Sequence, residues 1–222
     1  MQFQPSTSLD PFSETSFRDA ASRKLHAEPP VHTRPATGAG PSDFDLNPEI
    51  LAESSLDSPA RAAAVLVPVV KRPELSLLFT QRTDHLPAHA GQIAFPGGKT
   101  DESDASPLAT ALREAHEEIG LDPTLVEPLG FLDSYRTGTG YRITPVVALV
   151  DPGFALTLNR DEVVDAFEVP LPFLMDTRNH QVHVRELGGR ERRFYAMPYG
   201  DRFIWGATAG ILRNMHERLF KP

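Results

Sequence analysis

The stretch GGKTDESDASPLATALREAHEEIGL (97–121) constrains the fold of this chain more than any other. Its second half carries the start and stop signals of a helix. Ser106 can serve as the N-cap, Pro107 suits the first helical turn, and Gly120 is a left-handed stop. Apolar residues recur at helical spacing over 108–119 and form one stripe. The sequence therefore predicts an amphipathic helix between Ser106 and Gly120.

Three carboxylates crowd one flank of this helix. Glu114 and Glu118 are i,i+4 neighbours, and Glu117 lies beside them. Like charges at this spacing destabilise a helix, whereas Mg²⁺ or Mn²⁺ would favour such a group of oxygen ligands. A glutamate-rich helix face is more often only a solvated surface. The preceding loop, FPGGKTDESD, favours a metal site, because paired glycines let the backbone approach a phosphate closely.

These residues resemble the signature of the Nudix hydrolases, Gx5Ex7REUxEExGU, in which U is a bulky apolar residue. The second half of the signature is matched by Arg113, Glu114, Ala115, Glu117, Glu118, Gly120 and Leu121. The first half departs, because Gly98 and Arg113 are one residue further apart than the signature allows. We expect one inserted loop residue, which leaves Asp104 or Ala105 at the position of the first glutamate.

The upstream segment 77–101, LLFTQRTDHLPAHAGQIAFPGGKTD, resembles the extended motif of the coenzyme A diphosphatase subfamily, LLTxRxxxLRxHxGxxxFPGG. The residues in register are Gln81, Arg82, His85, Leu86, His89, Gly91, Gln92 and Phe95 to Gly98. Pro87 and Ala88 depart from a stretch that is often basic in the subfamily. The spacing of His85 and His89 would suit Zn²⁺ on a helix, but the nearby proline and glycine favour a loop.

The resemblance implies the Nudix fold, an α/β architecture with a mixed β-sheet between helices. It also implies hydrolysis, with Mg²⁺ or Mn²⁺, of the diphosphate bond of coenzyme A or its acyl or oxidised derivatives. The products would be 4′-phosphopantetheine and adenosine 3′,5′-bisphosphate. Another nucleoside diphosphate derivative, such as ADP-ribose, a dinucleoside polyphosphate or NADH, is the alternative within the family. A sensor that binds a nucleotide without cleaving it is the alternative outside catalysis, and the retained glutamates and Arg113 argue against it.

The expected site residues follow from the same motifs. The metal ligands are Glu114, Glu118 and Glu117, the catalytic group is Glu114, Glu117, Arg113 and Glu162, and the substrate-binding group is Arg82, Gly97, Gly98 and Lys99. Arg113 would orient Glu114 or its loop by charge-assisted hydrogen bonds. Arg82 and Lys99 are candidate phosphate partners. Glu162 is the candidate for a further base or ligand, against the simpler reading of a surface carboxylate.

Composition narrows the classes of partner. A formal net charge of −8 argues against a generic nucleic-acid binder, and the absence of cysteine excludes disulfides and thiolate metal sites. No apolar run approaches the roughly 20 residues that span a bilayer, and the N-terminus has no signal-peptide core. We expect a cytoplasmic protein, without nucleic-acid or membrane partners, that acts on a small molecule as a monomer or homodimer.

The chain divides into an extension over 1–60 and a domain over 61–222, an organisation that 222 residues with 40% hydrophobic content allow. In the extension, Asp10-Pro11 predicts the start of a short helix with Phe17, Ala21 and Leu25 on one face. A linker rich in proline and glycine follows, and then a second short helix over 46–51. We favour a peripheral arm that packs on the domain over a partner-binding segment.

The domain is expected to contain strands over 62–70, 75–82, 92–95, 125–137 and 142–150, and a strand or turn over 163–171. The segment 137–141, TGTGY, reads as a hairpin turn, although a loop that touches substrate is an alternative. A closing helix is expected over 203–219, with Trp205 packed in the core. The aromatic residues just before it, Phe194, Tyr195 and Tyr199, are expected either to line a pocket or to fill the core.

Overall fold

A computed structural model describes the protein over residues 10–30, 40–49, 60–84, 91–187 and 189–221. The larger of its two sheets is mixed. Its strands are β1 (Arg61–Val70), β2 (Ser76–Arg82), β3 (Ile93–Ala94), β4 (Gly97–Lys99), β5 (Val126–Phe131), β6 (Tyr135–Arg136), β7 (Tyr141–Val150) and β8 (Val163–Pro170). The main path runs β3-β2-β1-β7-β5, while β4 pairs with β1, β6 with β7, and β8 with β2. The β1–β7 pair is parallel and the others are antiparallel, so the expected mixed sheet is confirmed.

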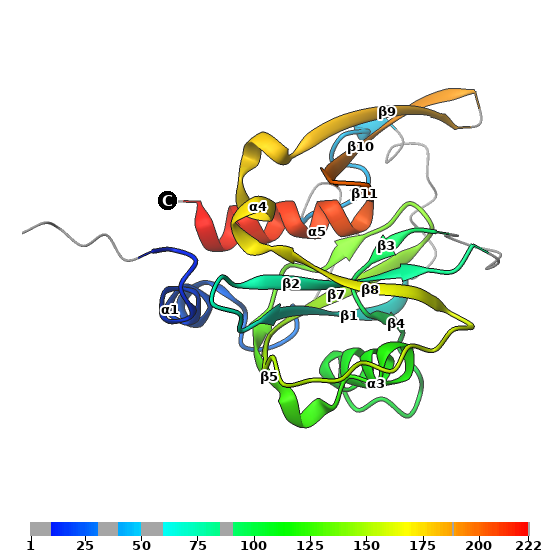
Figure 1. The fold of residues 1–222 in the computed structure, drawn as a ribbon. Coiled ribbons are helices and arrows are strands. Elements are labelled where there is room, and N and C mark those ends of the chain that lie inside the picture. Colours follow the sequence, from blue (N-terminus) through cyan, green and yellow to red (C-terminus); the bar gives the residue numbers. More distant parts are fainter. Residues whose placement is uncertain (1–9, 31–39, 50–59, 85–90, 188, 222) are drawn as a thin grey trace, which may run out of the picture.

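Strand β1 is buried on both faces, as its continuous apolar run predicts. Leu66 and Val70 pack toward one face, with helix α3 (Pro107–Ile119), and Val67 and Val69 pack toward the other, with helix α5 (Ala207–Met215). Figure 1 shows the resulting layers, with α3 below the large sheet and α5 above it. The sheet therefore lies between helices, and the two cores lie on its two faces.

The remaining short elements join these layers. They are η1 (Pro123–Leu125), α4 (Leu171–Met175), η2 (Thr177–Asn179) and the π-helical turn η3 (His216–Phe220). Figure 1 shows α4 beside α5, on the opposite side of the sheet from α3. In the part of the chain that the structure describes, no helix has both the length and the apolar character needed to cross a bilayer.

A second, three-stranded sheet lies beyond α5 (Figure 1). It is antiparallel, with the order β11-β10-β9, and consists of β9 (Gln181–Leu187), β10 (Arg190–Tyr199) and β11 (Arg202–Trp205). The expected start of the closing helix at Phe203 is therefore wrong. Residues 203–205 pair with β10, and Gly206, at φ 66°, turns the chain sharply before the helix begins at Ala207.

The N-terminal segment packs onto the domain. Helix α1 (Glu14–Lys24) is capped by Ser13, whose side chain accepts from the Ser16 amide, so the expected start at Asp10-Pro11 is three residues early. Phe17 is fully buried in the core that contains α5. Arg18 donates to Glu127 on β5 at 2.8 Å. This contact confirms, for α1, the expectation of a packed arm. Of the expected helix over 46–51, Pro48 and Glu49 are helical, and residues 50 and 51 lie outside the described residues.

Candidate active site

Helix α3 has the predicted boundaries. The Ser106 hydroxyl accepts from the Ala109 amide at 3.1 Å, Pro107 opens the first turn, and Gly120 adopts the left-handed conformation at φ 67°. Ala111, Ala115 and Ile119 are buried against the sheet, as the apolar stripe predicts. This packing fixes the rotation of the helix about its axis. It places Glu118 and Glu114 beside strand β4, which follows the FP dipeptide of the extended motif.

Glu118 is the buried acid of this site, with only 3% of its surface exposed. The Gly97 amide donates to its carboxylate at 3.2 Å, and a guanidinium nitrogen of Arg82 lies 3.8 Å away. Burial raises the pKa of Glu118 to about 8, and the nearby charges of Glu114 and Glu162 act in the same direction. The one amide and the distant guanidinium compensate this carboxylate only in part.

Glu114 lies against the glycine pair. A Cβ atom on Gly98 would stand 2.5 Å from the Glu114 carboxylate, and one on Gly97 would stand 2.4 Å from the Ala64 carbonyl oxygen. Gly97 also has φ 154°, which side chains disfavour. The two glycines therefore allow a close approach between β4 and the helix. Burial raises the pKa of Glu114 as well, and the Arg113 guanidinium opposes that rise.

Arg113 holds several groups of the site together. Its Nε and one terminal nitrogen donate to both oxygens of Asp104, at 3.0 and 2.9 Å. Its other terminal nitrogen lies 3.0 Å from Glu114 and 2.9 Å from Glu117. A further donation reaches the backbone carbonyl of Lys99 at 3.2 Å. Arg113 thus ties the loop, β4 and the helix to one another.

Asp104 is the acid for which the sequence offered two alignments. Its side chain is only 5% exposed, and the fork of hydrogen bonds from Arg113 holds its pKa well below the usual range. The Thr110 hydroxyl also donates to it at 2.9 Å. Positions 104 and 105 are the two candidates for the first glutamate of the signature, and position 104 carries the carboxylate that contacts Arg113. The sequence could not assign this contact, because the inserted residue breaks the signature spacing.

Of the other predicted residues, Glu162 affects the two glutamates electrostatically, whereas Glu117 and Lys99 are exposed. Glu162 precedes β8, and its charge raises the pKa of both Glu114 and Glu118. The Asn159 amide lies 3.4 Å from its carboxylate. Glu117 is exposed and turned toward Arg113. Lys99 is exposed and contributes its backbone carbonyl to Arg113. His85 and His89 lie outside the described residues.

The oxygen donors fit a hard divalent cation, although they do not form a closed ligand set. Among the residues that the structure describes, no three His, Cys, Asp or Glu side chains are gathered closely enough to hold a metal ion. Glu117 in particular is exposed, whereas Glu118 is buried. The fit rests on Glu118, a carboxylate buried with a raised pKa, which a cation would neutralise.

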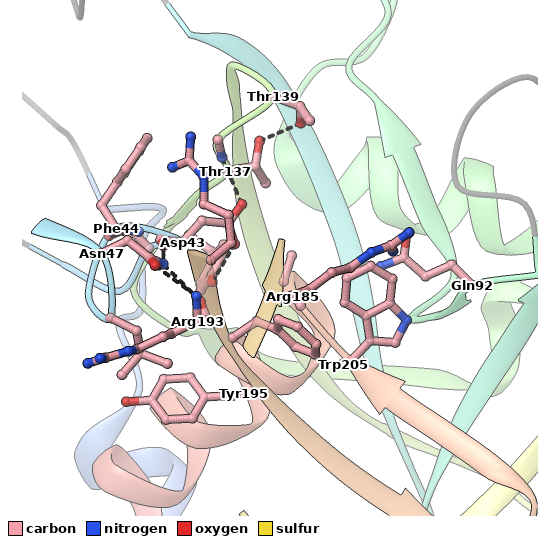
Figure 2. A pocket seen from close by; sticks show the side chains of 18 residues that line it. Asp43, Phe44, Asn47, Gln92, Thr137, Thr139, Arg185, Arg193, Tyr195 and Trp205 are labelled. Atoms are coloured by element: carbon pink, nitrogen blue, oxygen red, sulfur yellow. Dashed lines mark hydrogen bonds between the residues drawn. The ribbon is translucent and has the colours of Figure 1, made fainter. Parts of the chain in front are cut away.

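A cavity of about 730 Å³ (Figure 2) is lined by residues of the segment 42–47, the β6–β7 turn and strands β9, β10 and β11. Its lining includes Asp43, Asn47, Gln92, Thr137, Thr139, Arg185, Arg192, Arg193, Phe194, Tyr195 and Trp205.

Trp205 was expected in the core, and this expectation is wrong, because the indole is half-buried and lines the cavity. Phe194 and Tyr195 also line it, whereas Tyr199 packs against Phe173. The segment TGTGY forms the β6–β7 hairpin turn, and its Thr137 and Thr139 line the cavity too.

The strands that carry these cavity residues were missed by the sequence reasoning. A signal was present, since two glycines stand between the alternating stretches QVHVREL and RERRFYAMPY. Two-residue glycine loops favour a β-hairpin, and β9 and β10 pair antiparallel. No comparable pattern in the sequence indicates the role of Asn47. It accepts from the Arg193 amide and donates to the Arg193 carbonyl, both at 2.8 Å, across 146 residues of chain.

The fold and the site define the class, an α/β domain with a mixed sheet between helices and a glutamate-bearing helix against a glycine turn. The family model for the NUDIX domain matches residues 60–185. The chain belongs to the Nudix family, whose hydrolases act on pyrophosphate bonds and generally use divalent metal ions. The α/β architecture with a mixed sheet is the Nudix fold.

Individual proteins are similar to this chain over most of the same region. The uncharacterized Nudix hydrolase NudL of Escherichia coli K12 is 45% identical over 156 residues, which cover 70% of this chain and 81% of the relative. NudL of Shigella boydii serotype 18 matches to the same extent, with 45% identity over 156 residues, 70% of this chain and 81% of the relative. Among solved structures, the Nudix hydrolase RenU of M. smegmatis is 22% identical and covers 54% of this chain and 76% of its own, with a TM-score of 0.45.

Proposed function

We propose that this protein hydrolyses the diphosphate bond of coenzyme A, or of its acyl or oxidised derivatives, to 4′-phosphopantetheine and adenosine 3′,5′-bisphosphate. The observation that carries the hydrolase chemistry is the buried Glu118, held at the Gly97 amide and facing Glu114. The choice of coenzyme A is supported by the extended motif over 77–101, in which Arg82 and the FPGG run lie at this same site.

Glu114 and Glu118 are the proposed ligands of Mg²⁺ or Mn²⁺, and Glu117 is a further ligand if it leaves Arg113. A bound divalent cation would offset the negative charge that develops on the diphosphate oxygens and would activate a water for attack on phosphorus. The burial of Glu118 favours this binding, because a buried carboxylate gains more from a cation than an exposed one does.

The other residues position the reacting groups. Arg113 positions Glu114 through their ion pair and anchors the loop through Asp104. Gly97 and Gly98 let β4 lie against the Glu114 carboxylate, and Arg82 and Lys99 are the proposed cationic partners of the diphosphate oxygens. The Nε of Arg82 is buried without a hydrogen-bond partner among the described residues, so this side chain has a donor to offer.

Glu162 is the proposed base that takes the proton of the attacking water. It lies directly before β8, and its charge raises the pKa of Glu118. Its own backbone is fixed, since the Thr83 amide donates to its carbonyl at 3.0 Å. Glu117, which is exposed and lies 2.9 Å from Arg113, remains a second candidate for this step.

The test is turnover of coenzyme A with Mg²⁺ or Mn²⁺, with the products resolved by mass spectrometry. ADP-ribose, a dinucleoside polyphosphate and NADH are assayed in parallel. We expect coenzyme A to be cleaved with the highest kcat/KM. Glu114→Gln should lower that value by at least about 100-fold, because mutating a residue that only supports a metal ligand already lowers activity by about 10- to 100-fold.

The matched control is Glu102→Gln, the same change at an exposed glutamate in the loop before the helix. We expect this variant to keep wild-type turnover. Unchanged turnover in Glu114→Gln would refute the assigned chemistry. Preferred cleavage of ADP-ribose or NADH would refute coenzyme A as the substrate while leaving the diphosphatase assignment in place.

A further inference from the structure

The cavity beyond α5 contains two arginines that face each other without acidic partners. Arg185 on β9 and Arg192 on β10 are directly opposite in the antiparallel register, and both line the cavity. Like charges opposite one another destabilise a β-ladder. Within the described part of the chain, neither guanidinium has a carboxylate partner, and the Nε of Arg192 is buried without a hydrogen-bond partner. An anion held between the two guanidinium groups would relieve this repulsion.

The acidic residues of the same hairpin do not neutralise the pair. Glu186 and Glu191 are opposite each other in the next register position. Because neighbouring side chains on a strand point to opposite faces, this position carries their carboxylates to the other face of the sheet. Arg185, Arg192 and Phe194 therefore share one face of the hairpin, and Glu186 and Glu191 are on the other face, from which Arg193 and Tyr195 also line the cavity.

Aromatic rings continue the face that carries Arg185 and Arg192. Phe194 is two residues beyond Arg192 on β10, and Trp205 on β11 is opposite Ala196, the next residue of that face. The two ring centroids are 5.2 Å apart, with the rings tilted by 60°. Residues two apart on a strand are separated by about 7 Å. One wall thus presents a cation pair and, next to it, an aromatic surface. This combination suits a phosphate group attached to a planar ring system.

The opposite wall is preformed by hydrogen bonds. Asp43 accepts from the Tyr135 hydroxyl at 2.8 Å and from the Gly138 amide at 2.7 Å, so its charge is used in fixing the β6–β7 turn. Asn47 holds the free edge of β10 at Arg193. Figure 2 shows Asp43 and Asn47 on one side of the cavity and Arg185, Trp205 and Gln92 on the other. The acidic group is therefore occupied, and the basic wall is left for a ligand.

Gln92 connects this cavity to the carboxylate site. Its side chain lines the cavity, and its backbone carbonyl accepts from the Arg82 amide at 3.0 Å. The Arg82 guanidinium in turn lies 3.8 Å from Glu118. Asp43, Asn47, Arg192 and Trp205 all lie outside residues 60–185, the span that the family model matches. The cavity therefore combines residues of the matched span, such as Gln92 and Arg185, with residues on either side of it.

We infer that this cavity binds the nucleoside end of the substrate, with a phosphate monoester on Arg185 and Arg192 and the base on Trp205. The inference rests on the proposed function for the identity of the substrate, because the nucleoside of coenzyme A carries such a phosphate on its ribose. On this inference, the two arginines select for that phosphate. The cavity, rather than the metal site, then discriminates among nucleoside diphosphate derivatives.

The test compares coenzyme A with 3′-dephospho-coenzyme A. We expect the wild-type protein to prefer coenzyme A by about 10- to 100-fold in kcat/KM, the value of hydrogen bonds to a charged group. The double variant Arg185→Gln/Arg192→Gln should lose this preference, so that its kcat/KM values for the two compounds become equal. The control is Arg23→Gln/Arg178→Gln, which makes the same change in net charge at two exposed arginines of α1 and η2.

Binding without turnover separates this inference from the proposed function. Adenosine 3′,5′-bisphosphate and AMP are titrated into metal-free protein by calorimetry. The wild type should bind the bisphosphate more tightly than AMP by the same factor, and only the double variant should lose the difference. Trp205→Leu should weaken both ligands alike.

Each outcome decides one of the two claims. A wild-type preference that survives in the double variant, or bisphosphate binding that ignores the arginines, overturns the cavity assignment. Arginine-dependent binding of the bisphosphate, together with no cleavage of coenzyme A, supports the cavity assignment and overturns the proposed substrate. A wild type that binds neither nucleotide overturns the cavity assignment whatever its activity.

Discussion

Replacing Glu118 by glutamine should stabilise the metal-free protein at alkaline pH. Burial raises the pKa of this carboxyl from 4.5 to about 8. Between these values the unfolded chain releases the Glu118 proton and the folded protein keeps it. The contribution of Glu118 to stability is therefore fully present below about pH 4.5 and is lost as the pH rises through about 8.

The magnitude follows from the same shift. At about 1.4 kcal/mol per pKa unit, the ionised side chain costs the folded state about 5 kcal/mol above pH 8, and relaxation of the site will lower this value. Glutamine carries no charge, and its amide oxygen can still accept from Gly97. We expect Glu118→Gln to exceed the wild type by about 2 to 5 kcal/mol at pH 9, with a difference near zero at pH 4.5.

The assay is urea denaturation in a chelating buffer at pH 4.5, 6, 7.5 and 9, with the two proteins compared at each pH. Other titrating groups, such as Asp104, change equally in both proteins and cancel in the difference. Glu117→Gln is the control, because Glu117 is exposed on the same helix, and it should differ from the wild type by less than about 0.5 kcal/mol at every pH. Mg²⁺ should then stabilise the wild type and not Glu118→Gln. A difference between Glu118→Gln and wild type that stays constant from pH 4.5 to 9 would refute the reasoning.

Two further substitutions test the close contacts of the fold. Gly98→Ala would place a methyl group 2.5 Å from the Glu114 carboxylate and displace it, so we expect turnover to fall about 100-fold, while Gly153→Ala on the surface should leave turnover unchanged. Wild-type turnover in Gly98→Ala would contradict the proposed role of the turn. Phe17→Ala should destabilise the protein by about 3 to 5 kcal/mol in thermal or urea unfolding, because Phe17 is fully buried. The control, Phe203→Ala, is 40% exposed and should cost less than about 1 kcal/mol, and equal losses in the two variants would contradict the packing of α1.

The features predicted best from the sequence are those fixed by neighbours in the chain. The cap at Ser106, the stop at Gly120 and the apolar stripe between them all act within one helix, so they locate α3 and its glutamates. The buried run over 62–70 is equally local and gives β1. The closing helix was placed four residues early, because residues 203–205 pair with β10, a contact that is not local.

The site itself was predicted only in part, for the same physical reason. Glu114 and Glu118 lie on one helix, so their spacing predicts that they share a flank. Glu162 lies directly before β8 and raises the pKa of both, and no pattern in its own segment indicates that position. The partner of Arg113 was uncertain because one inserted residue separates Asp104 from the signature spacing, and only the folded loop brings its carboxylate to the guanidinium.

Two charge clusters of opposite sign, the glutamates of α3 and the arginine pair of the β9–β10 hairpin, each indicate a ligand. At α3, the carboxylate of Glu118 is buried beside one amide and a distant guanidinium, and its raised pKa measures how much a cation would contribute. Beyond α5, Arg185 and Arg192 repel each other with no described carboxylate between them, and an anion would relieve that repulsion. A substrate with a diphosphate at one end of a nucleoside and a further phosphate on its sugar would suit both clusters, reaching the cation at the first site and the arginines at the second. A nucleotide with only one of these groups would leave one cluster uncompensated. Under the proposed function, we therefore expect selectivity for a doubly phosphorylated nucleoside to come from the two clusters together and not from the proposed metal site alone.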